Sequence, residues 1–453
     1  MSAHLIDAGT GFLKIAAKVS RWRLFNRRTI PSSGIISRIF HRREAGECGD
    51  RLSPRRAGTD RPSHGWSSVL GFGFAEGGKR GFVRGVDSLT HAVLGAAVGE
   101  ALLGRRLGNR ALAWGALFGS LPDVDVLVSP LLGNAWELWW HRGPTHSVVV
   151  MVLAAWFLGP RLAKFWKKEK VTRALAGWFV LAELGGHVLL DCFSVYGTGV
   201  WWPLPVARVG FGNLFIIDPW FALPLVVSLV MLWRLRTKKE QARRRRIGAW
   251  GLGLAGGYVV LSFALKFWVS RGIGEDLARR GVVCERRMES PTPFNLILWR
   301  AVVDRGDAFW VGYRSVFEGK DSRVRWTVYP KGREAVAGLE KDGGFRAVDG
   351  FSGGWWIARR HVKGAWMGDL RFGEARVWGE RKGMVDGYCA FAWDVMPGEP
   401  GEKLRRCRFP RQDAGESLWR MCKRAFGNRE AWEANPRLAG VTGSLPEFLA
   451  VEE

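Results

Sequence analysis

The stretch HRGPTHSVVVMVLAAWFLG, residues 141–159, sets two histidines and an arginine directly before a run of residues apolar enough to sit in a bilayer. Other segments of residues 87–218 repeat this combination, and the resulting candidate ligands are His91, Asp123, Asp125, His141, His146, His187, Asp191 and Asp218. A charged Asp in the middle of a membrane helix costs roughly 2.5–3.5 kcal/mol, so several such groups together usually mark a functional site. Because neutral imidazole and carboxylate are common ligands of zinc and manganese, the stretch predicts a divalent-metal site.

The composition is that of a membrane protein in which apolar and basic blocks alternate. Hydrophobic residues make up 47% of the 453-residue chain, yet the mean hydropathy is only -0.05 and the net charge is +26. The basic residues lie mainly in short clusters beside apolar runs, without zinc-finger spacing or a basic repeat studded with aromatics. Membrane topology therefore explains the charge, and we predict membrane lipids rather than nucleic acid as partners.

Six apolar segments approach the ~20 residues that a helix needs to cross a bilayer, which predicts an α-helical integral membrane bundle of about six spans. The segments are residues 88–104, 111–132, 147–165, 174–193, 215–233 and 247–269. The first carries Glu100 and the third carries Arg161 and Lys164 near one end, so both are expected to be tilted, re-entrant or sheltered by neighbours. Pairs of glycines four residues apart are typical of close helix packing, and they are Gly95/Gly99, Gly115/Gly119 and Gly253/Gly257.

Composition divides the chain into three parts. Residues 1–86 mix basic clusters with Pro, Ser and Gly, and we expect a disordered or mis-assigned extension, or else a basic tail on anionic lipid. Residues 87–271 form the helical membrane part. Residues 272–453 alternate Trp, Val, Arg and Gly in short runs, which predicts a small β-rich domain outside the bilayer, with antiparallel strands that bury one face. Disulfides remain an open alternative for its cysteines, Cys284, Cys389, Cys407 and Cys422.

Basic residues gather in three connections between the expected spans, at 105–110, 161–173 and 234–246. Because Lys and Arg are enriched in cytoplasmic loops, all three connections should be cytoplasmic. The histidines and aspartates then lie at the opposite, outer ends of the helices. Because the number of spans is even, residues 272–453 should lie on that same outer side. We therefore predict a multi-pass protein of the bacterial cytoplasmic (inner) membrane whose site and C-terminal domain face outward.

Two of the polar motifs lie at turns between helices. In Pro122-Asp123-Val124-Asp125 the proline interrupts a helix and both carboxylates lie on one side of the turn. This arrangement suits metal ligands, and it also suits a plain helix end. The motif from His141 to His146 packs two imidazoles and the guanidinium of Arg142 around a Gly-Pro turn, which indicates either a metal site or an interfacial loop.

The third motif is helical. His187 and Asp191 are four residues apart and therefore share one face of a helix. Glu183, one turn earlier, is placed to accept the second ring N–H of His187. For the whole set of polar residues, a network that merely holds the helices together remains the alternative.

Five motifs in this order resemble those of the YdjM-like family of predicted membrane-bound metal-dependent hydrolases. They are residues 87–91 (DSLTH), 119–125 (GSLPDVD), 141–147 (HRGPTHS), 187–191 (HVLLD) and 217–219 (IDP). The resemblance covers residues 86–235, and residues 291–300 look like the end of the longer family members. It implies a metal-dependent hydrolase and a chain start near Val86, where a valine codon would initiate translation.

His187 and Asp191, with the Asp and His residues upstream, are more distantly similar to zinc-dependent phospholipase C and the S1/P1 nucleases. Those enzymes have a second His-x-x-x-Asp or His-x-x-x-Glu pair, whereas the only later histidine here is His361, in the β-rich part. The resemblance therefore implies a divalent metal, zinc with manganese as the alternative, and one or two ions rather than three.

Together these patterns predict a membrane-bound hydrolase acting on a phosphodiester or a lipid-like substrate at the outer membrane surface. The metal would activate a water molecule and polarise the scissile bond, and Arg142 would neutralise a substrate anion such as phosphate. Asp123 or Asp125 is the expected general base, Glu183 a supporting residue and Asp218 the weakest ligand candidate. A metal or solute transporter, which should place such groups near the bilayer midplane, and a non-catalytic membrane scaffold remain the alternatives.

Overall fold

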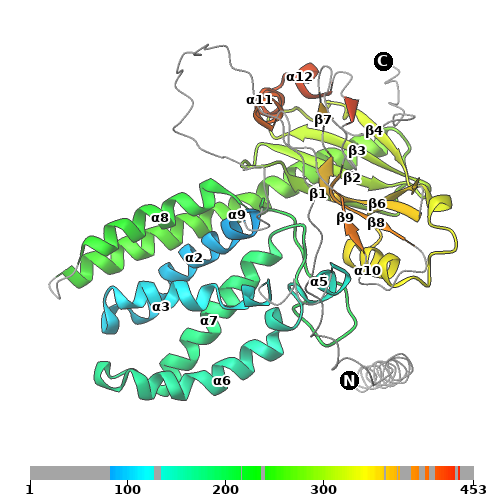
Figure 1. The fold of residues 1–453 in the computed structure, drawn as a ribbon. Helices are drawn as coiled ribbons and strands as arrows, with labels where there is room; N and C mark the ends of the chain where they lie inside the picture. The colour runs from blue at the N-terminus through cyan, green and yellow to red at the C-terminus, as the bar shows by residue number, and fades with distance from the viewer. Residues whose placement is uncertain are drawn as a thin grey trace, which may run out of the picture. The chain divides into compact units, whose positions relative to one another are not determined.

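The computed structural model describes residues 82–126, 134–215, 217–235, 240–361, 364–374, 376–377, 389–396, 404–407, 414–433 and 437–438. All of these residues belong to one compact unit, Phe74–Glu453. Most of the expected N-terminal extension, residues 1–81, lies outside them. Within the unit a helical part is followed in the chain by a part built on antiparallel sheets (Figure 1).

The helices of the first part are α2 Phe82–Leu107, α3 Arg110–Gly119, η1 Pro122–Val124, α5 Asn134–Trp140, η2 Pro144–His146, α6 Val148–Phe165, η3 Lys167–Glu169, α7 Arg173–Cys192, α8 Pro219–Arg234 and α9 Gln241–Arg279. Among the described residues, α6, α7 and α9 are long and apolar enough to cross a membrane, and α8 is apolar but shorter. The expected count of six spans is not confirmed. The second expected span is cut short because α3 ends after 10 residues, about 15 Å, just before Pro122.

The three basic connections meet at one end of the helices. Arg110, before α3, pairs with Glu169, between α6 and α7, at 2.8 Å. Asn109 Nδ2 donates to the carbonyl of Trp233, at the end of α8, at 2.8 Å. The basic connections expected to lie together are therefore close to one another.

A buried ion pair joins α2 to α9 near this end. Arg244 Nε donates to Glu100 Oε1 at 3.0 Å and a terminal nitrogen donates to Glu100 Oε2 at 2.6 Å. The same guanidinium reaches Asn109 Oδ1 at 2.6 Å and the carbonyl of Leu232 at 3.0 Å. Glu100, the charge that made the first expected span unusual, is thus neutralised by a neighbouring helix.

The glycines of α2 and α3 let the two backbones touch. A Cβ atom at Gly99 would lie 2.5 Å from the carbonyl oxygen of Ala111, and one at Gly119 would lie 2.8 Å from an α-carbon of α2. The sequence expectation of close packing is confirmed for these two pairs. Nothing among the described residues lies within 4 Å of a Cβ atom built at Gly253 or Gly257, so the third pair makes no such contact.

Among its described residues, the second part contains two four-stranded antiparallel sheets and a two-stranded one. The first sheet has the order β1 (Arg286–Pro291), β2 (Leu298–Asp304), β3 (Ala308–Ser315) and β4 (Trp326–Pro330). The second has the order β5 (Trp356–His361), β6 (Gly364–Glu374), β8 (Cys389–Val395) and β9 (Arg405–Arg406), and the third pairs β7 (Arg376–Val377) with β10 (Arg437–Leu438). The remaining elements are η5 Arg333–Ala335, α10 Gly343–Ser352, α11 Ala414–Ala425 and α12 Glu430–Glu433.

The β-rich character expected for this part is therefore confirmed, with two corrections. The cysteines expected to be available for disulfides are free in the structure: Cys284, Cys389, Cys407 and Cys422. The first sheet also buries both faces rather than one. Alternate residues of β2 serve two cores, because Leu298 and Val302 pack in one cluster while Trp299 and Val303 pack with Val269 of α9 in another.

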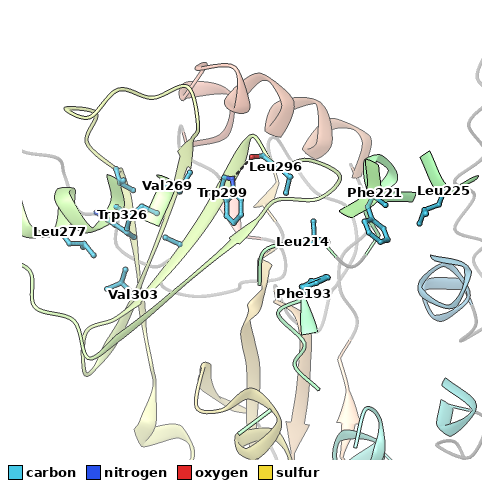
Figure 2. Close-up of a cluster of buried hydrophobic side chains, with 14 of the residues drawn as sticks. Phe193, Leu214, Phe221, Leu225, Val269, Leu277, Leu296, Trp299, Val303 and Trp326 are labelled. Atoms are coloured by element: carbon cyan, nitrogen blue, oxygen red, sulfur yellow. Dashed lines mark hydrogen bonds between the residues drawn. The ribbon is translucent and has the colours of Figure 1, made fainter. Parts of the chain in front are cut away.

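Helix α9 links the two parts. It has 39 residues and is about 58 Å long, so it exceeds the ~30 Å hydrocarbon thickness and continues past the expected boundary at residue 271. Figure 2 shows Leu277 of its C-terminal part in one apolar cluster with Trp326 and Trp299, whose indole nitrogen donates to the Leu296 carbonyl at 2.8 Å. The helix therefore carries the membrane part directly into the core of the first sheet.

Candidate metal centre

Five of the eight candidate ligands meet at the end of the helices opposite the basic connections. Helix α2 contributes His91, η1 contributes Asp123, η2 contributes His146, and α7 contributes His187 and Asp191. Pro122 and Pro144 each stand at the start of their short 3-10 helix, where a missing backbone N–H costs nothing, and so the chain turns at both positions. The convergence expected from the motif order is thus present in the structure.

Four possible ligand atoms of this cluster lie within 4 Å of one or both of the two histidine Nε2 atoms. The Nε2 atoms of His146 and His187 are 3.1 Å apart. Asp191 Oδ2 lies 3.2 Å from the first and 3.6 Å from the second, and Asp123 Oδ1 lies 3.8 Å and 3.5 Å from them. Ligands bound at 2.0–2.2 Å around a tetrahedral ion are about 3.3–3.6 Å apart. The five separations given above run from 3.1 to 3.8 Å and therefore include that range.

Hydrogen bonds on the far side of each ring fix which nitrogen faces the cluster. His187 Nδ1 donates to the carbonyl of Gly119 at 2.6 Å. His146 Nδ1 lies 2.9 Å from Thr145 Oγ1, and that hydroxyl donates to Asp125 Oδ2 at 3.0 Å, so the ring nitrogen is the donor to the hydroxyl. Both Nε2 atoms therefore carry lone pairs, which face each other at 3.1 Å. A cation between them would turn this repulsion into two favourable bonds, so the residues present fit a divalent metal.

The protonation states outside the spans agree with this donor set. Burial lowers the pKa of His146 below its ordinary value, although the neighbouring Asp191 carboxylate opposes the shift. The imidazole is therefore neutral at pH 7, the form that binds metal. Burial alone would raise the pKa of Asp123, but the nearby His187 and His91 outweigh it and hold that pKa below the ordinary range. This carboxylate is accordingly ionised.

His91 and Arg142 hold the second oxygen of Asp191. His91 Nε2 lies 3.1 Å and a terminal nitrogen of Arg142 lies 3.0 Å from Asp191 Oδ1. The His91 ring also stacks on His187 with centroids 3.7 Å apart. Two triads consequently have ligand atoms within 4.8 Å of one another, and they share one residue: His91, His187 and Asp191, and Asp123, His146 and His187. Both are groups that could hold a metal ion.

The Arg142 side chain is not placed for the role expected of it. It was expected to neutralise a substrate anion, but it is only 1% exposed and its guanidinium contacts Asp191, Ser194 Oγ at 3.2 Å and the Tyr196 ring at 4.7 Å. Its backbone has a positive φ of 57°, which few residues other than glycine adopt. Arg142 therefore neutralises and orients Asp191.

Asp125 and His141 lie beside the cluster rather than in it. Asp125 accepts hydrogen bonds from the backbone N–H of Arg142 at 3.1 Å and from Thr145 Oγ1 at 3.0 Å, and His141 Nδ1 lies 3.2 Å away. Burial would raise the pKa of Asp125, but His141 and His146 lower it further than burial raises it. Asp125 thus holds the turn before α6, while the His141 side chain, 17% exposed, lies at the open edge.

Two other candidates have different partners from those expected. Glu183 is buried in α7. The His187 N–H that we expect Glu183 to accept is donated to the carbonyl of Gly119 instead. Neither carboxylate oxygen of Glu183 has a hydrogen bond within the described part of the chain. Asp218 caps α8 by accepting from the backbone N–H of Trp220 at 3.0 Å, and it also accepts from Tyr258 Oη at 3.0 Å. Neither carboxylate belongs to the triads.

Several supporting residues were not singled out by sequence. Ser88 Oγ donates to Asp123 Oδ2 at 3.1 Å, which turns Oδ1 toward the histidines. The Gly119 carbonyl orients His187, and Ser194 and Tyr196 contact Arg142. Ser88 and Gly119 lie within the quoted motifs. Any residue can supply a backbone carbonyl, however, so the residue type at position 119 does not reveal this contact. Ser194 and Tyr196 follow α7 closely and carry no pattern of their own.

Comparisons with known proteins agree with the position of this cluster. The family model described as YdjM inner membrane protein matches residues 86–269, which contain all eight candidate ligands. The inner membrane protein YbcI of Escherichia coli (strain K12) is 31% identical over 173 residues, covering 32% of this chain and 95% of that protein. No solved structure matches the chain.

Proposed function

The chain belongs to the YdjM family of inner membrane proteins, and on this premise we propose that it is a membrane-bound metal-dependent hydrolase. Asp123, His146, His187 and Asp191 would hold the ion. The observation that carries the proposal is the pair of Nε2 lone pairs facing each other at 3.1 Å between two carboxylates. Two imidazoles and two carboxylates at tetrahedral spacing suit zinc, and manganese is the alternative because it also accepts oxygen ligands.

The chemistry follows from the groups around the ion. A divalent ion would supply Lewis acidity toward a phosphoryl oxygen and lower the pKa of a water molecule. Arg142 and His91 keep Asp191 ionised and orient it toward the cluster. Asp125 orients the neutral ring of His146 through the hydroxyl of Thr145. His141 Nδ1 faces Asp125, so its Nε2 is the basic nitrogen that accepts a proton from the attacking water and returns it to the leaving group.

The position of the site supports an enzyme over a transporter. The cluster lies beside the C-terminal ends of α3 and α7 and the N-terminal half of α2, next to the partly exposed His141. Transporters instead bind their cargo near the bilayer midplane on broken helices. We further propose that the basic connections are cytoplasmic and that the site and the β-rich part lie outside the inner membrane, because Lys and Arg are enriched in cytoplasmic loops.

Labelling of cysteines in intact cells tests this orientation. Cys422 is exposed on the β-rich part, and a membrane-impermeant maleimide should label it from outside. A cysteine placed at the basic connection by Lys168→Cys should react only after the membrane is permeabilised. A Cys422→Ser variant shows the background. Labelling of position 168 but not of Cys422 in intact cells would reverse the orientation.

The hydrolase itself is tested by comparing His141→Gln with the wild-type protein. Purified wild-type protein loaded with zinc should hydrolyse bis(p-nitrophenyl) phosphate, lose turnover when a chelator removes the metal, and regain it with zinc. His141→Gln should lower turnover by about 10²- to 10⁴-fold, the usual contribution of general acid–base catalysis, because glutamine cannot take up a proton. Its metal content should stay unchanged, since His141 is outside the triads.

Two outcomes would contradict this assignment. Equal loss of metal and turnover in His141→Gln would make His141 a ligand instead of an acid–base group. Turnover of the wild-type protein that survives complete removal of the metal would refute a metal-dependent mechanism. The melting temperature of each preparation shows whether a lost activity reflects the chemistry or the fold.

A further inference from the structure

Large aromatic side chains are exposed directly beside the candidate metal centre. Helix α5 ends one residue before His141, and it buries Ala135 and Leu138 against the β-rich part while its other face exposes Trp136, Trp139 and Trp140. This division makes α5 a short helix anchored on one face and apolar on the other. Exposed tryptophan is costly in water but favourable at the boundary between headgroups and acyl chains.

A second exposed apolar segment borders the same turn. Residues 201–206 expose Trp201, Trp202, Leu204 and Val206. The chain just before them is tied to the site, because Gly199 N–H donates to the carbonyl of Arg142 at 2.7 Å and Val148 N–H donates to the carbonyl of Val200 at 2.9 Å. Residues 136–140 and 201–206, called the tryptophan collar below, therefore both adjoin the turn that carries His141 and His146.

Both segments of the collar adjoin the start of α6, a helix with an exposed apolar face. Helix α6 begins immediately after the turn, is long and apolar enough to cross a membrane, and exposes Val149, Val152, Leu153 and Trp156 along its first turns. An apolar face of this kind on a membrane helix is covered by acyl chains. Because the collar lies where α6 begins, it falls at the end of the hydrocarbon layer, which is the level of the headgroups.

Beside the collar, Arg208 has no salt bridge to a carboxylate within the described residues. Arg208 NH2 donates to the carbonyls of Leu138 at 2.8 Å and Trp139 at 3.2 Å, which fixes its guanidinium against α5. The guanidinium lies 5.9 Å from the centroid of the Tyr196 ring, and His141 packs on that ring with centroids 5.4 Å apart. A positive charge beside His141 complements a phosphate group.

We propose that the tryptophan collar inserts into the membrane interface and that the substrate of the metal centre is a membrane phospholipid, which enters sideways from the bilayer with its phosphate near Arg208 and His141. The inference rests on the proposed hydrolase function. In the reaction the oxygen of water bonds to phosphorus and one phosphoester P–O bond breaks. His141 Nε2 takes the proton from water, and the leaving alkoxide receives it.

Fluorescence of a probe in the collar tests the insertion. In full-length protein with Cys48, Cys284 and Cys422 replaced by serine, an environment-sensitive NBD label is attached to a cysteine made by Leu204→Cys. In vesicles of phosphatidylcholine and phosphatidylglycerol, this label should shift to the blue and be quenched by lipids carrying a shallow doxyl group. A label at Lys341→Cys, exposed on the β-rich part, should stay in water. Equal exposure of both labels to water would overturn the insertion.

Kinetics with two substrates test the lipid as substrate. The double variant Trp136→Ser/Trp201→Ser should lower kcat/KM for vesicle phospholipid by roughly tenfold or more, because two large apolar anchors are lost. Turnover of soluble bis(p-nitrophenyl) phosphate and metal content should not change. Trp178→Ser is the matched control, since Trp178 is an equally exposed tryptophan near the opposite end of the helices, and it should affect neither substrate.

The outcomes separate this inference from the proposed function. Wild-type hydrolysis of the soluble diester without hydrolysis of vesicle lipid would overturn the lipid substrate and leave the hydrolase standing. Equal losses on both substrates in the double variant would also overturn it, because the tryptophans would then support the fold. Hydrolysis of neither substrate by zinc-loaded wild-type protein would overturn both.

Discussion

Replacement of His187 by alanine is expected to remove the bound metal and to lower hydrolysis on the order of 10³-fold or more, the several kcal/mol that a catalytic metal contributes. His187 belongs to both triads, and its Nε2 lies 3.1 Å from His146 Nε2 and 3.5 Å from Asp123 Oδ1. The Gly119 carbonyl and the His91 ring hold the His187 ring in place, and alanine has no ligand atom to offer there. Metal content by mass spectrometry and turnover of a phosphodiester should fall together.

The matched control for this change is Asp218→Asn. Asp218 shares the same motif series but caps α8, and asparagine caps helices about as well as aspartate, so metal and turnover should both be retained. Retained metal in His187→Ala would contradict the site. Loss of metal in Asp218→Asn, with an unchanged melting temperature, would show that the cluster extends further than the triads.

Replacement of Arg244 by methionine is expected to destabilise the folded protein by about 3–5 kcal/mol, the usual cost of leaving a buried charge without its partner. The change strands the carboxylate of Glu100, buried between α2 and α9, and it also removes donors from Asn109 and the Leu232 carbonyl. Unfolding in detergent micelles, followed by denaturant titration, should show the loss, while metal content of the folded fraction should be unchanged.

Two further variants show that the effect comes from the buried pair. Adding Glu100→Gln to Arg244→Met removes the stranded charge and should recover much of the loss. Arg271→Ala breaks an exposed pair with Glu275 on the same helix and should change stability by less than about 1 kcal/mol. If Arg244→Met proved no more harmful than Arg271→Ala, the pair would not hold α2 to α9.

The sequence identifies the part of the site that depends on side-chain type and on helix ends. His91, Asp123, His146, His187 and Asp191 stand where apolar segments begin or end, and antiparallel helices bring such positions together. The same reasoning located the basic connections at the other end. The β-rich part was predictable as well, because short alternating runs of aromatic and β-branched residues favour antiparallel strands.

What the sequence does not show is which way each polar side chain turns. Asp123 and Asp125 look equivalent, yet the first faces the histidines and the second binds the backbone of the following turn. Arg142 is buried against Asp191, and Glu183 is displaced from its expected partner by a backbone carbonyl. The sequence also did not predict the number of spans correctly. Helix α3 is apolar, but it ends at Gly119 and is much shorter than the bilayer is thick.

The most direct measurement is the position of the metal in wild-type protein grown with zinc. Anomalous diffraction collected on both sides of the zinc absorption edge locates the ion without reference to the protein geometry. We expect a peak about 2.0–2.2 Å from Asp123 Oδ1, His146 Nε2, His187 Nε2 and Asp191 Oδ2. A peak elsewhere, or fully occupied zinc bound only at His141 and Asp125, would contradict it, and so would the absence of any peak in zinc-saturated crystals.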